Sequence, residues 1–120
     1  MKTVLTLHQN WFWVATVSTG GVGLWGLALA SLKRTPGRVF AVGRALAIGA
    51  MLVQVGLGLT LYAQDLRPDS FHIFYGFVIV FTFSFAYIYR PQLAKRPALS
   101  YGLLLLFVMG LGLRAWSNVA

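Results

Sequence analysis

The sequence predicts an all-α integral membrane protein, an up-down four-helix bundle in which every long helix crosses the bilayer. Of the 120 residues, 58% are hydrophobic and only 10% are charged, whereas a soluble domain carries about 25% charged residues. The hydrophobic residues fall into four long runs, and the segments that join the runs are short and contain proline. We therefore expect a single transmembrane domain that covers residues 1–120.

Each hydrophobic run has the length that a membrane-spanning helix needs. The runs cover about residues 11–32, 39–62, 71–89 and 99–116. A helix rises about 1.5 Å per residue, so about 20 residues cross a hydrocarbon core about 30 Å thick. A membrane strand needs only about 10 residues and alternates apolar with polar positions, a pattern that these runs lack.

The connections between the runs set the directions of the helices. The three links cover residues 33–38, 63–70 and 90–98, and each contains at least one proline. Because proline interrupts a helix, each run is expected to end at its link. Links this short make consecutive helices antiparallel, which gives the up-down order.

The basic residues predict which side of the membrane each link occupies. The net charge is +8, and seven of the ten basic residues lie in or next to the first and third links: Lys33, Arg34, Arg38, Arg44, Arg90, Lys95 and Arg96. Lysine and arginine are enriched in cytoplasmic loops, so we expect these links in the cytoplasm and both termini outside the cell membrane. Short basic clusters between apolar runs are typical of membrane topology, so nucleic acid is not an expected partner.

Few residues in this sequence are able to carry chemistry. Cysteine is absent, which excludes thiolate metal sites, iron–sulfur ligation and covalent haem attachment. Both acidic residues, Asp65 and Asp69, lie in the second link, so the helices offer no carboxylate for a proton or ion pathway. Catalytic and phosphate-binding patterns are also lacking. We expect no independent enzymatic activity, and a transporter or channel subunit is disfavoured.

The two histidines are the candidate metal ligands. His8 lies at the outer end of the first predicted helix, and His72 opens the third. These two helices run in the same direction and are diagonal neighbours in an up-down bundle, so the rings can meet and hold a haem iron between two axial imidazoles. The alternative is that each histidine is an ordinary interfacial residue, like the tryptophans and tyrosines near the helix ends.

Four further residues are candidates to contact a haem held by this pair. Gly76 lies one turn after His72 on the same face and leaves room for a flat macrocycle, although membrane glycines also serve close packing. Gln54 is expected to hydrogen-bond across helices or to a cofactor edge. Arg67 and Arg114 lie at the outer side, where each can pair with a haem propionate or extend to water.

The spacing of these residues resembles that in the haem A synthase family. Gln54 and Gly58 form a Gln-x-x-x-Gly pattern, an outer loop follows, and His72 opens the next helix, while His8 opens the helix two spans earlier. The resemblance covers roughly residues 7–90 and implies that His8 and His72 are axial ligands of one b-type haem in a half-size bundle. The family's catalytic glutamate has no counterpart here, so the resemblance does not imply haem A synthesis.

Two functions follow as hypotheses. In the first, the chain is a small b-type cytochrome that binds haem b and transfers electrons with a quinone or an external partner, within or beside a respiratory or photosynthetic complex. In the second, it is a cofactor-free accessory subunit. It would then pack its Phe-rich segment, residues 71–85, and its Gly-rich faces against other membrane protein subunits of a larger respiratory or photosynthetic complex. Lipid is an expected partner in both cases.

Overall fold

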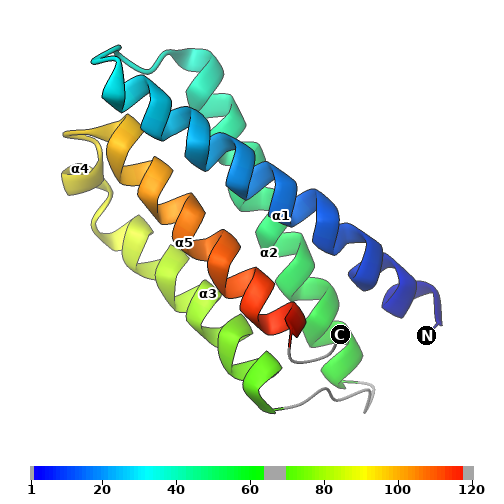
Figure 1. The fold of residues 1–120 in the computed structure, drawn as a ribbon. Coiled ribbons are helices and arrows are strands. Elements are labelled where there is room, and N and C mark those ends of the chain that lie inside the picture. The colour runs from blue at the N-terminus through cyan, green and yellow to red at the C-terminus, as the bar shows by residue number, and fades with distance from the viewer. Residues whose placement is uncertain (1, 64–69, 118–120) are drawn as a thin grey trace.

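Four long helices lie side by side in the computed structural model, which describes residues 2–63 and 70–117 (Figure 1). They are α1 (Lys2–Ser31), α2 (Arg38–Ala63), α3 (Ser70–Ile88) and α5 (Pro97–Ser117), and the single turn α4 (Arg90–Leu93) precedes α5. The bundle measures 47 Å along its longest axis and 24 and 21 Å across. The predicted all-helical fold is therefore confirmed over the described residues.

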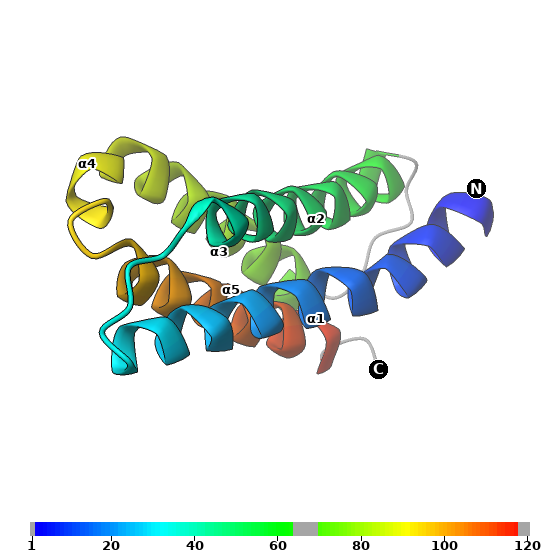
Figure 2. The same cartoon turned by 90° about the horizontal axis from the view of Figure 1, so that it is seen from above.

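The helices form a ring in the order α1, α2, α3, α5. α1 packs closely against α2 and α5, and α3 packs against α5 but touches α2 only lightly. Within the described ranges, the backbones of α1 and α3 do not approach each other, so these two helices are diagonal, as predicted. The α1–α2 connection and α4 lie at one end of the bundle, opposite the start of α1 and the end of α5 (Figures 1 and 2).

One predicted boundary was wrong, and one link contains a helical turn that was not predicted. α1 begins at Lys2 rather than near residue 11, because residues 2–10 contain no glycine or proline and include good helix formers. Hydropathy detects only the part of a helix that suits lipid, so it missed this first segment. The third link also contains the turn α4, with Pro91 in its first turn, where the missing N–H of proline costs no helical hydrogen bond.

The outside of the bundle is apolar over much of its length. Three segments are long and apolar enough to span a membrane, Thr3–Ser31, Arg38–Ala63 and Pro97–Ser117, and α3 carries the shorter apolar stretch His72–Ile88. Large side chains such as Val17, Val39 and Leu46 are 68%, 73% and 68% exposed. A soluble monomer rarely exposes so much contiguous apolar surface, and these features are those of a membrane protein.

Glycines allow α1 and α5 to approach at backbone contact distance. A Cβ atom added to Gly26 would lie 2.6 Å from the carbonyl oxygen of Ala98, and one added to Gly23 would lie 3.0 Å from that of Gly102. Lipid provides no hydrophobic drive for helices to associate, so dispersion contacts of this kind hold the pair together. A Cβ atom at Gly21, by contrast, would meet no atom within 4 Å.

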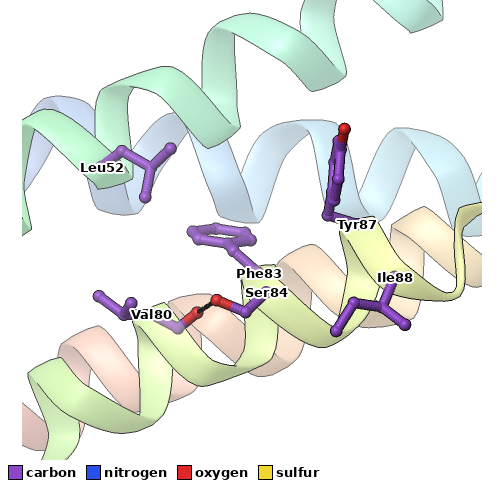
Figure 3. A pocket seen from close by; sticks show the side chains of 6 residues that line it. All are labelled: Leu52, Val80, Phe83, Ser84, Tyr87 and Ile88. Atoms are coloured by element: carbon purple, nitrogen blue, oxygen red, sulfur yellow. Dashed lines mark hydrogen bonds between the residues drawn. The ribbon is translucent and has the colours of Figure 1, made fainter.

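The light contact between α2 and α3 leaves an open groove of about 450 Å³. The groove is lined by Leu52, Val80, Phe83, Ser84, Tyr87 and Ile88 (Figure 3). The Ser84 hydroxyl donates to the Val80 carbonyl oxygen at 2.9 Å, so its hydrogen bond stays within its own helix. The groove is therefore mainly apolar, and it marks the most loosely packed seam of the bundle.

The α1–α5 contact predicts opposite effects for two glycine substitutions. Gly26→Ala should lower the free energy of unfolding by about 1–3 kcal/mol, because the new methyl group overlaps backbone atoms of α5. Gly21→Ala should be neutral or stabilise by up to about 1 kcal/mol, because alanine is the better helix former and the space is open. Equilibrium unfolding in detergent, followed by circular dichroism, measures both. Equal effects would contradict the proposed packing.

Candidate functional site

His8 on α1 and His72 on α3 face one another across the diagonal of the bundle. Their ring centroids are 6.1 Å apart, and the ring planes are inclined by 79°. The backbones of the two helices do not pack together, so α1 and α3 approach each other here through these two side chains. The predicted meeting of the two histidines is thus confirmed, although His8 lies inside α1 rather than at its end.

The C-terminal turn of α5 holds His72. The Nδ1 atom of His72 lies 2.8 Å from the carbonyl oxygen of Ala115. Ala115 is in the last turn of α5, where carbonyl groups lack an amide partner in the helix. A carbonyl oxygen can only accept, so Nδ1 of His72 donates the proton and Nε2 of the neutral ring keeps its lone pair. Second-shell hydrogen bonds of this type orient histidine ligands in metal sites.

Two residues on one face of α2 position His8. Gln54 Nε2 donates to the carbonyl oxygen of His8 at 2.8 Å, which confirms the predicted bond between helices. Gly58 is one turn further along α2, and a Cβ atom there would lie 3.2 Å from Cε1 of His8. The Nδ1 atom of His8 is buried without a hydrogen-bond partner in the described part of the chain. Such a group costs about 1–3 kcal/mol unless a ligand satisfies it.

The other predicted contact residues lie in different surroundings. Gly76 borders open space, since an added Cβ atom would meet nothing within 4 Å. Arg114 is exposed on α5, and its Nε donates to the hydroxyl oxygen of Tyr75 at 3.4 Å. Arg67 lies outside the described residues.

Two residues near the site, Trp11 and Ala115, were not singled out from the sequence as site residues, and Gly58 was named only as part of the Gln-x-x-x-Gly pattern. Trp11 was assigned to the interfacial aromatic belt, but its Nε1 donates to the carbonyl oxygen of Ala50 at 2.7 Å within the bundle. The i+3 spacing of Trp11 from His8 places both on one helix face and is a signal for this position. Ala115 contributes only its backbone, and the contact between Gly58 and His8 depends on how α1 packs against α2.

The distance between the rings suits two ligands on opposite sides of one metal ion. A bond from a metal to an imidazole nitrogen is about 2.0–2.1 Å, and the ring centre lies roughly 1.2 Å beyond that nitrogen, so two opposed rings have centres about 6.4 Å apart. The observed separation is 6.1 Å. Inclined ring planes are compatible with this geometry where the inclination arises by rotation about the metal–nitrogen axis, and the observed inclination is 79°.

The set of donors fits haem better than a bare metal ion. Across residues 2–63 and 70–117, no group of three or more His, Cys, Asp or Glu side chains comes together. A structural zinc ion takes four ligands, which are mostly protein side chains. A porphyrin brings four nitrogens of its own, so two axial histidines complete the coordination of its iron.

Comparisons with known proteins assign no family to this chain. No family profile, curated protein sequence or solved structure matches this chain. The resemblance to the haem A synthase family remains a prediction from the spacing of His8, Gln54, Gly58 and His72.

The bond from Gln54 to His8 predicts a measurable link between α1 and α2. Gln54→Leu should lower the free energy of unfolding by about 0.6–1.7 kcal/mol, the range found for hydrogen bonds between membrane helices. Gln92→Leu is the matched control, because Gln92 lies exposed in α4, away from the histidines. Unfolding in detergent compares the two variants, and an equal loss of stability in both would show that Gln54 has no special role.

Proposed function

We propose that this chain is a small membrane cytochrome that binds one b-type haem between His8 and His72 and takes part in electron transfer. The observation that carries the proposal is the separation of 6.1 Å between the two rings across the bundle. The resemblance of the histidine and glutamine spacing to the haem A synthase family supports the same assignment. A bound haem supplies one-electron redox chemistry that none of the side chains here provides.

In this proposal, the protein supplies orientation and a low-polarity environment. The Ala115 carbonyl oxygen fixes the tautomer of His72, and Gln54 together with Gly58 sets the position of His8. The open face at Gly76 leaves room beside His72. Arg114 and Arg67 are the candidate partners of the propionates, because a guanidinium group pairs with a carboxylate through two hydrogen bonds.

The proposed topology has four spans, with both termini outside. α3 has 19 residues, which corresponds to about 28 Å and is within the length range of membrane helices. The basic links lie at the end of the bundle that carries the α1–α2 connection and α4. Under the positive-inside rule this end would be cytoplasmic, and His8 and His72 would lie near the outer surface. An electron partner would then be a quinone in the membrane or a redox protein of a larger respiratory or photosynthetic complex.

An exposed aromatic stripe on α3 favours a second candidate, a cofactor-free accessory subunit. Phe74, Phe77, Phe81 and Phe85 recur at helical spacing and are 57%, 62%, 60% and 53% exposed. Stripes of this kind suit packing against another membrane subunit as well as against lipid. In this candidate, the histidines form only an edge-to-face ring pair, for which 6.1 Å is also an ordinary separation.

Optical spectroscopy on protein purified from a haem-replete host separates the two candidates. The cytochrome should carry about one haem per chain and show a sharp α-band on reduction. His8→Ala and His72→Ala should each lower haem occupancy at least about tenfold, because a single axial imidazole holds haem b weakly. A wild-type protein without a Soret band would contradict the haem proposal and favour the accessory subunit.

A pair of glycine variants tests the haem position without removing a ligand. Gly76→Leu fills open space beside His72, so it should fold normally but bind several-fold less haem. Gly110→Leu is the control, because Gly110 on α5 also borders open space but is not next to either histidine in sequence. Equal haem content in the two variants would show that Gly76 does not border the haem.

A further inference from the structure

A concave pocket of about 430 Å³ lies at the end of the bundle opposite the histidines. It opens between the α1–α2 connection and the start of α5, two segments that lie near each other in Figure 1. Three basic side chains line it, Lys33 and Arg34 from the first link and Arg96 from the segment before α5. The remaining lining residues are Ala30, Pro36, Pro97, Ala98 and Leu99.

The close contact between α1 and α5 holds the two walls of the pocket together. Gly26 on α1 approaches the carbonyl oxygen of Ala98, and Ala98 itself is a buried lining residue. The last turn of α1 and the first turn of α5 are therefore fixed relative to each other. The pocket is a consequence of the helix packing rather than of a chance approach of two loops.

Lys33 occupies a backbone position where glycine is the usual residue. Its φ angle is 55°, in the left-handed region. The Lys33 amide donates to the Ala30 carbonyl oxygen at 3.1 Å, and the Arg34 amide donates to that of Leu29 at 2.9 Å, so α1 ends in a Schellman motif. A side chain in this conformation costs roughly 1–2 kcal/mol. The lysine thus places its charge at the pocket despite an unfavourable backbone conformation.

The charge of the pocket is not compensated within the described part of the chain. Lys33, Arg34 and Arg96 form no ion pair there, and both acidic residues of the sequence, Asp65 and Asp69, belong to the link between α2 and α3. Three like charges around one concavity repel each other and create a positive potential. An anion bound among them would relieve this repulsion.

An apolar stripe runs from the pocket along α5. Leu99 lines the pocket, and Leu103 and Phe107 follow at intervals of four residues, which keeps them on one side of the helix. Leu103 and Phe107 are 53% and 55% exposed. A ligand that combines an anionic group with a hydrocarbon chain would match both the pocket and the stripe.

We propose that this pocket binds the phosphate headgroup of an anionic phospholipid, with an acyl chain along Leu99, Leu103 and Phe107. Basic pockets between membrane helices on the cytoplasmic side recognise anionic lipids in this way. Arg34 and Arg96 offer guanidinium groups for the phosphate oxygens, and Lys33 adds a third positive charge. The assignment does not depend on haem binding.

The test compares two triple variants that lose the same charge at the same end of the bundle. Lys33→Gly/Arg34→Gln/Arg96→Gln removes the charges of the pocket, and glycine suits the backbone of position 33. Arg38→Gln/Arg90→Gln/Lys95→Gln removes three nearby charges that do not line it. Binding of phosphatidylglycerol and phosphatidylcholine to each protein in lipid nanodiscs is measured by native mass spectrometry, with inorganic phosphate as a competitor.

The wild-type protein and the control variant should prefer phosphatidylglycerol, and the pocket variant should lose this preference by about tenfold or more. Inorganic phosphate should not displace the lipid, because it cannot use the apolar stripe. An equal loss in both triple variants would overturn the proposal in favour of diffuse charge attraction. Displacement by inorganic phosphate would show that the pocket is a simple anion site.

Discussion

The close packing of α1 against α5 is the contact on which both proposed sites of this molecule depend. Gly23 and Gly26 allow the two backbones to meet, because any side chain at Gly26 would overlap the Ala98 carbonyl group. At one end, this contact fixes the walls of the basic pocket. At the other end, α5 presents the carbonyl oxygen of Ala115 to His72, so the same helix orients one of the two proposed ligands.

Polar atoms inside a membrane protein are expensive unless they are paired, because lipid offers no hydrogen bonds. Around the histidines, most polar atoms have found partners: Gln54 bonds to His8, and His72 bonds to Ala115. Besides Oγ1 of Thr16, two polar atoms among the described residues are buried without one, Nδ1 of His8 and Oε1 of Gln54. These two unpaired atoms belong to neighbouring residues at the centre of the proposed haem site, where a bound group or water would satisfy them.

Much of the fold could be predicted from the sequence, because hydropathy and proline placement report directly on helices and links. α2, α3 and α5 begin and end within two residues of the predicted runs. The early start of α1 could not be predicted in this way, because residues 2–10 are neutral in hydropathy and only helix propensity extends the helix through them. The ends of such helices are set by small differences in local conformational free energy, and their assignment varies by one or two residues.

The candidate site was only partly predictable. The types and order of the side chains indicate which residues can be ligands, but the contacts of those residues depend on how the helices pack. His8 and His72 could be paired from helix order alone, and Gln54 could be assigned to a bond between helices. The roles of Gly58 and Ala115 depend on the rotation of α2 and α5 about their axes. The weak hydrophobic periodicity of these helices does not specify that rotation. The basic pocket depends in the same way on the approach of Gly26 to Ala98.

The central claim is that His8 and His72 coordinate one iron from opposite sides. Electron paramagnetic resonance of the oxidised, haem-containing protein tests it most directly. Two imidazoles whose planes are inclined by 79° should give a strongly anisotropic low-spin ferric signal, and His8→Ala or His72→Ala should abolish it. A high-spin signal from the wild-type protein, or a low-spin signal that survives the loss of either histidine, would contradict the account.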